Sequence, residues 1–83
     1  MGKNILDSII ENYPDEELLK ADGFDEAIIG IETNSMKLVY DKDLMIEILM
    51  KEMEYSDAIE YLEYNVYCAY VGERTPIYIE RFN

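Results

Sequence analysis

The sequence predicts an α+β domain, in which a small antiparallel sheet of about three strands packs against helices in the order α-α-β-β-α-α-β. A segment rich in β-branched residues at 27–32 lies close to a second strand-like segment at 36–40, which favours a pair of strands. Apolar residues with helical spacing flank this pair on both sides. Pro76 then prevents a helix from continuing, and the alternating run 77–79 is typical of a closing strand.

Length and composition indicate one domain over residues 1–83. The chain is 49% hydrophobic and contains no repeat, low-complexity segment or linker. A domain of this size buries only about 60% of the surface that its unfolded chain exposes, so a deep catalytic cleft is hard to build. We therefore expect a protein that binds a partner, without catalytic residues and without a cofactor.

The charge of the chain restricts its partners. It has 19 acidic residues, 7 basic residues and no histidine, which gives a net charge of −12. Direct binding to nucleic acid is disfavoured, because that binding depends on Lys and Arg side chains that neutralise phosphates. A basic protein surface is the partner that such a charge would attract, including the basic groove of a nucleic-acid-binding protein. A surface that serves only to keep the protein soluble is the alternative.

The N-terminal part predicts two short helices. The first covers residues 4–12 and ends before Pro14, because the residue before a proline is disfavoured in helices. The second begins at Pro14, carries acidic residues 15–17 at its positive end and stops near 21–23. The apolar residues expected to face the core are Ile5, Leu6, Ile9, Ile10, Leu18 and Leu19.

The central part predicts a hairpin. Ile28, Ile29 and Ile31 favour a strand, and Gly30 within it is typical of a bulge or of close packing against another backbone. Polar residues 32–35 form the turn, and 36–40 returns as the second strand. Because an isolated hairpin is marginal in water, it requires a third strand or helices against it.

Asp41 is the expected N-cap of the following helix, with Asp43 in its first turn. The apolar arc of this helix is wide enough to be buried in the core or by another chain, and the core is favoured in a small domain. Its members are Leu44, Met45, Ile46, Ile48, Leu49, Met50 and Met53. Asp41, Asp43 and Glu47 lack the ligand spacing and glycine of a calcium loop, so we predict no metal site.

Ser56 is the expected N-cap of a last helix, with Gly72 as its C-terminal cap. Cys68, the single cysteine, lies on this helix and has no histidine to serve as its base, which favours a buried, unreactive thiol. An unpaired thiol fits a reducing cytosol.

No stretch approaches the roughly 18 apolar residues of a membrane span, so we expect no membrane partner.

The candidate partner-binding residues are Asp57, Glu60, Glu63 and Tyr64, which recur at spacings of three and four on the last helix. Carboxylates there can contact Lys or Arg, and tyrosine adds contact area at low entropic cost. A solvated helix face is the alternative. Tyrosines at every third position step around a helix by about −60°, so they cannot form one stacking ladder for a nucleotide.

Three segments carry a resemblance to a known group: GFDEAIIGIE, LVYD and EYLEYNVYCAYVGERTPIYI. They resemble small acidic, uncharacterised proteins of tailed bacteriophages that share the pattern EYNVxGAYVGExTPI. The resemblance covers roughly residues 22–79 and is most specific over 65–76, although Cys68 stands where the pattern has glycine. It implies phage origin and expression in the host bacterial cytoplasm, and it transfers no activity and no catalytic residue.

Together these observations predict a non-enzymatic phage accessory protein that binds a host or phage protein through an acidic, tyrosine-containing surface. Inhibition of a basic nucleic-acid-binding protein is one form of this role. The alternative is a small structural or assembly component of the virion that associates with itself as a homo-oligomer. An enzyme that acts through carboxylates ranks third, because acid–base catalysis requires a cleft and a defined carboxylate separation.

Overall fold

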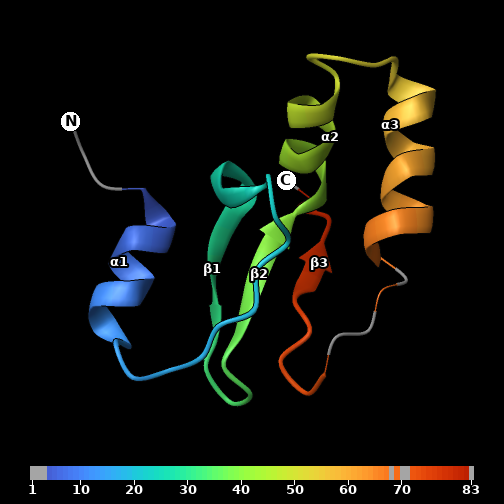
Figure 1. The fold of residues 1–83 in the computed structure, drawn as a ribbon. Coiled ribbons are helices and arrows are strands. Elements are labelled where there is room, and N and C mark those ends of the chain that lie inside the picture. Colours follow the sequence, from blue (N-terminus) through green and yellow to red (C-terminus); the bar gives the residue numbers. More distant parts are fainter. Residues whose placement is uncertain (1–3, 68, 70–71, 83) are drawn as a thin grey trace.

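The computed structural model describes residues 4–67, 69 and 72–82, and the fold is α+β, as the sequence predicts (Figure 1). The described elements are α1 (Ile5–Asn12), a 3₁₀ turn (Asp25–Ala27), β1 (Ile28–Glu32), β2 (Lys37–Asp41), α2 (Lys42–Leu49), α3 (Tyr55–Leu62), a π-helical turn (Glu63–Tyr67) and β3 (Ile77–Ile79). The predicted closing strand at 77–79 is therefore confirmed.

The sheet is mixed, with the strand order β1-β2-β3. Strands β1 and β2 form the predicted antiparallel hairpin, and the pairing shifts between Ile28 and Gly30, as expected for a glycine bulge. Strand β3 pairs with β2 in parallel, so the prediction of an antiparallel sheet is wrong for the third strand. The reason is the connection: α2 and α3 together form a crossover that returns the chain to the end of the sheet where β2 begins (Figure 1).

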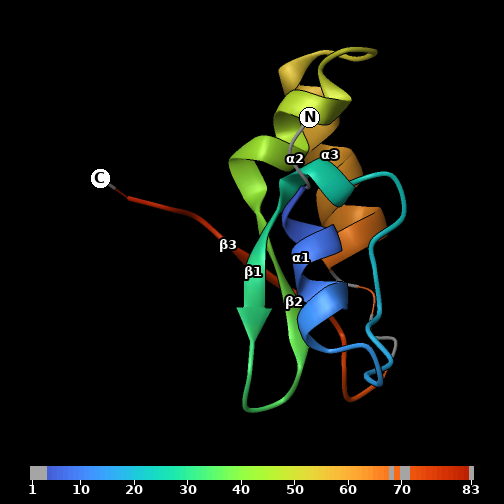
Figure 2. The same ribbon diagram turned by 90° about the vertical axis from the view of Figure 1, so that its left-hand side faces the viewer.

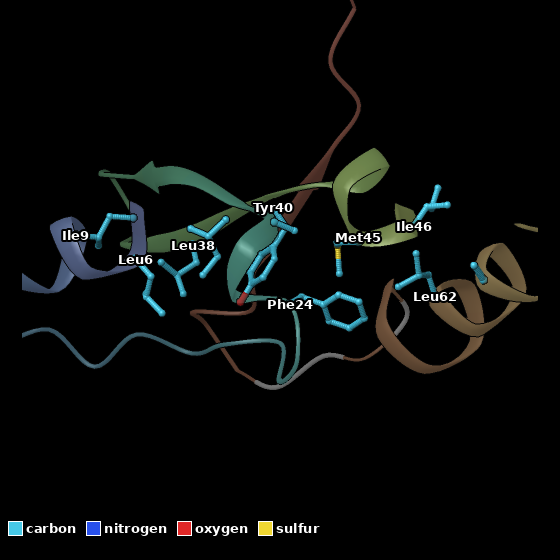
Figure 3. Close-up of a cluster of buried hydrophobic side chains, with 11 residues drawn as sticks. Leu6, Ile9, Phe24, Leu38, Tyr40, Met45, Ile46 and Leu62 are labelled. Atoms are coloured by element: carbon cyan, nitrogen blue, oxygen red, sulfur yellow. The ribbon is translucent and has the colours of Figure 1, made fainter. Parts of the chain in front are cut away.

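One face of the sheet carries the core (Figures 2 and 3). Leu38 and Tyr40 of β2 point into it and are completely buried. Helix α1, the segment that follows it, and α3 cover this face (Figures 2 and 3). The buried apolar residues are Leu6, Ile9, Phe24, Ala27, Ile28, Leu38, Tyr40, Met45, Ile46, Ala58 and Leu62. Of the residues expected to be buried, Ile5, Ile10 and Met50 are instead exposed.

The predicted second helix does not form. After a turn at Pro14, residues 16–21 run across the molecule without regular structure. Long-range contacts hold this segment: the Arg74 guanidinium binds the Glu16 carboxylate at 2.7 Å and the Glu17 carbonyl at 3.2 Å. The Ala21 N–H donates to the Tyr40 hydroxyl at 2.8 Å. These partners replace the hydrogen bonds that a helix would have supplied within the segment.

The last helix begins earlier and ends sooner than predicted. The Ala58 N–H donates to the Glu54 carbonyl at 2.9 Å, which makes Glu54 the N-cap, so Ser56 lies inside the helix. Regular α-helix stops at Leu62. Gly72 does have a positive φ of 124°, but it belongs to a later turn, in which its carbonyl accepts from the Thr75 N–H at 3.2 Å. Gly72 is therefore not a helix cap.

Candidate partner-binding face

Helix α3 is fixed to the core by one side. Ala58 and Leu62 on that side are fully buried, and Ile59 packs against the core from its edge. Residues of α3 that lie a third of a helical turn or more around the axis from Ala58, Ile59 and Leu62 must then face outward. The hydrophobic period of α3 thereby determines which of its polar residues remain in contact with solvent.

All four predicted partner-binding residues are exposed, and Tyr64 has 77% of its surface accessible. Asp57, Glu60 and Tyr64 line one shallow surface groove, which Glu63 does not line. The structure thus places three of the four residues together and leaves Glu63 beside them on the π-helical turn.

The other residues that line this groove are Met53, Tyr61 and Asn65. Sequence reasoning missed them. Asn65 depends on the π-helical turn, where its side-chain amide donates to the Tyr61 carbonyl at 3.1 Å. A π turn is a local departure from the α-helical period, so the period alone could not place Asn65. Tyr61 was detectable, because it lies four residues after Asp57 and three before Tyr64.

The carboxylates of Asp57, Glu60 and Glu63 form no ion pair or hydrogen bond with another described side chain. The ion pairs among the described residues lie elsewhere. They are Lys20–Asp25 at 3.2 Å, Lys42–Glu80 at 3.6 Å, Arg74–Glu16 at 2.7 Å and Arg81–Asp41 at 2.6 Å. The outward side of α3 and of the first residue of the π-helical turn is consequently a strip of negative charge without a compensating cation from the described chain, and Asp57, Glu60 and Glu63 are called the acidic face of α3 below.

A second group of tyrosines lies at the sheet rather than on this face. The ring of Tyr78 lies 5.7 Å from that of Tyr40 and 5.1 Å from that of Tyr67, and the Lys42 ammonium lies 5.0 Å from the centre of the Tyr67 ring. Burial raises the pKa of Tyr40 and of Tyr67 to about 12, and it raises the pKa of Tyr78 as well. These rings are part of the packing, not of the exposed face.

Asp41 is the expected N-cap of α2. Its Oδ1 accepts from the N–H groups of Asp43 at 2.8 Å and Leu44 at 3.3 Å, and its Oδ2 accepts from Arg81 at 2.6 Å. Both carboxylate oxygens are therefore engaged within the fold. Within residues 4–67, 69 and 72–82, no group of three or more His, Cys, Asp and Glu side chains could hold a metal ion. Cys68 lies outside the described residues.

Comparison with protein-family models, curated proteins and solved structures yields no match for this chain. No helix in the described part of the chain has the length and apolar character needed to cross a bilayer. The support for the candidate partner-binding site is therefore the geometry and charge of its residues.

Proposed function

We propose that this chain is a non-enzymatic bacteriophage accessory protein that binds a basic surface of a host or phage protein in the bacterial cytoplasm. The observation that carries the proposal is the uncompensated acidic face of α3. Asp57, Glu60 and Glu63 are exposed and have no ion-pair partner among the described residues. Asp57 and Glu60 lie on α3, which the core holds in place, and Glu63 begins the π-helical turn that follows it. The resemblance to small acidic phage proteins supports the phage role.

The chemistry of the face fits a partner that presents Lys or Arg. A single exposed ion pair contributes only about 0.2–1 kcal/mol, so three carboxylates favour fast association more than they secure affinity. The aromatic rings beside them supply the apolar contact. Tyr64 and Tyr61 are both exposed, and tyrosine is enriched among the residues that dominate protein interfaces. Blocking the basic groove of a nucleic-acid-binding protein is one outcome of such binding.

Affinity capture from bacterial lysates tests the proposal. The immobilised full chain is compared with the variant Asp57→Lys, Glu60→Lys, Glu63→Lys, and lysates of infected and uninfected cells are used. The original chain should retain a basic protein that the variant releases, because each reversal replaces an attraction with a repulsion.

A matched control carries the same change in net charge on other exposed residues: Asp15→Lys, Glu26→Lys, Glu47→Lys. This control should retain the partner almost as well as the original chain. Equal retention by the original chain and the α3 variant would show that the acidic face is not the binding site. Loss of capture in both variants would show that binding depends on the net charge of the chain and not on the position of the carboxylates. That result would also contradict the proposal.

A further inference from the structure

The face of the sheet opposite the core carries a row of aliphatic side chains. Strand alternation places Val39, Ile77 and Ile79 on this outer face, since their neighbours Leu38, Tyr40 and Tyr78 point inward. Ile29, at the bulge, joins them. All four are partly exposed, and none of them packs against the core, although the partly exposed Ile31 does. Among the described elements, helices and loops gather on the other face (Figures 2 and 3).

The charges on the outer face are balanced. Glu32 of β1 lies opposite Lys37 of β2 in the strand register. At the other end of the face, the Asp41 carboxylate, whose side chain is only 2% exposed, is covered by Arg81. In a protein with a net charge of −12, the four charged residues placed here, Glu32, Lys37, Asp41 and Arg81, sum to zero around an apolar centre. Glu80, which precedes Arg81, is paired with Lys42 at 3.6 Å. It is thus suited to contact a surface that is equally apolar and neutral.

The segment that follows β3 leaves the domain on this same side (Figures 2 and 3). The 2.6 Å bond from Arg81 Nε to Asp41 Oδ2 sets its direction. The next residue, Phe82, is 87% exposed, more than any other large hydrophobic side chain that the structure describes. A phenylalanine held at the rim of an uncovered apolar face is poorly placed in a monomer, because it buries almost none of its surface.

We propose that the outer face binds a second copy of this chain. In a two-fold arrangement the aliphatic rows of the two sheets pack against each other, and Phe82 of each copy lies on the sheet of its partner. Because such an interface is self-complementary, each copy offers both the projecting ring and the apolar surface that receives it. The balanced charges avoid the repulsion that two acidic faces would impose.

The size of a stable interface explains why Phe82 takes part. Specific interfaces bury about 800 Å² on each partner, which is more than four aliphatic side chains provide by themselves. The extended residues 80–82 enlarge the contact beyond the sheet. Stacked sheets lie about 10 Å apart, a distance that leaves room for one layer of interdigitated side chains from both copies.

This inference is independent of the proposed function, since the acidic face of α3 belongs to the helical layer on the other side of the sheet (Figure 2). The sequence also predicted, as an alternative, a virion component that associates with itself. The outer face of the sheet is the surface through which such association would occur. The two surfaces also respond to salt in opposite directions. Salt screens the attraction between α3 and a basic partner, whereas it screens the long-range repulsion between two acidic copies and so strengthens the dimer.

Sedimentation of the full chain over a range of concentrations, at low salt and at about 0.15 M salt, where the Debye length is about 8 Å, tests the inference. The mass should rise from monomer to dimer with concentration, at lower concentration in the higher salt. Phe82→Ser, a change at an exposed position, should weaken the dimer by about tenfold or more. Val39→Lys should abolish it, and circular dichroism checks that this variant is folded.

Tyr64→Ser, also at an exposed aromatic residue, is the matched control and should leave the dimer unchanged. A chain that stays monomeric at every concentration and salt overturns the inference. So does a dimer of the same strength in the original chain and in Phe82→Ser, and that result remains decisive if Val39→Lys fails to fold.

Discussion

The sheet and helix α3 use the same residue types in opposite ways. At the sheet, the Asp41 carboxylate is buried and accepts three hydrogen bonds, and the rings of Tyr40 and Tyr78 pack on each other. On α3 and the π-helical turn after it, by contrast, the carboxylate of Glu60 and the ring of Tyr64 are exposed, and Glu60 has no ion-pair partner among the described residues. The difference shows that acidic and aromatic content alone does not identify a site. Carboxylates and rings that form their hydrogen bonds, ion pairs and packing contacts within the fold stabilise it. Those that lack such contacts are available to a partner.

The largest effect should come from Asp41→Ala. The change removes the N-cap of α2 and leaves the N–H groups of Asp43 and Leu44 without their acceptor, and it removes the partner of Arg81. Losing a cap costs about 1 kcal/mol and losing a hydrogen bond to a charged group about 1.5–3 kcal/mol, so the free energy of unfolding should fall by roughly 2–4 kcal/mol. Urea titration measures this change.

Asp43→Ala is the control for Asp41, because it removes an exposed carboxylate from the same helical turn. It should cost only about 0.3–1 kcal/mol, through the loss of its interaction with the helix dipole. Equal losses in the two variants would mean that Asp41 acts only through its charge and not through its hydrogen bonds.

An alkaline titration tests the burial of the Tyr40 hydroxyl. Burial raises the pKa of Tyr40 from 10.0 to about 12 in the folded chain, whereas the unfolded chain keeps the ordinary value. Below pH 10.0 the Tyr40 hydroxyl is protonated in both states and its contribution to stability is complete. As the pH rises toward about 12, the unfolded chain loses this proton first, so stability declines. Circular dichroism follows unfolding while absorbance follows tyrosinate formation.

Tyr40→Phe provides the comparison. It should lower stability at neutral pH, because the Ala21 N–H loses its acceptor, and it should lessen the loss of stability at alkaline pH. An unchanged alkaline profile in this variant would contradict the assignment of the effect to Tyr40.

Neutralising the acidic face should have the smallest effect on the fold. The variant Asp57→Asn, Glu60→Gln, Glu63→Gln should change the free energy of unfolding by no more than about 1 kcal/mol, because the loss of Asp57 from the first turn of α3 is offset in part by the relief of repulsion among the three carboxylates. Salt should stabilise the original chain by screening repulsion among its exposed carboxylates, and this gain should be smaller in the variant because fewer like charges remain. A loss of several kcal/mol in urea titration would show that these carboxylates support the fold instead.

Much of the local structure could be predicted, because it depends on neighbouring residues. Asp41 caps α2 through the N–H groups two and three positions later, Gly30 lies at the bulge, and α1 stops before Pro14. The exposure of Asp57 and Glu60 follows from the period of the buried residues in α3. Each of these features is determined within a few residues of sequence.

The features that the sequence did not indicate depend on distant residues. Arg74 binds Glu16 across 58 positions and holds an extended segment where a helix was expected. The direction of β3 depends on the length of the α2–α3 crossover, and the alternation of Ile77 and Ile79 is the same in a parallel and an antiparallel strand. The groove beside Glu60 could not be predicted, because Asn65, which lines it, is oriented by the π-helical turn.

The most direct measurement is the affinity of the captured basic partner for the original chain and for the neutralised variant Asp57→Asn, Glu60→Gln, Glu63→Gln, each determined across a series of salt concentrations. If the acidic face of α3 is the binding site, the original chain binds more tightly, its affinity falls steadily with salt, and the variant shows a weaker affinity with a much smaller salt dependence. Equal affinities and equal salt dependences in the two chains would contradict the assignment of partner binding to α3.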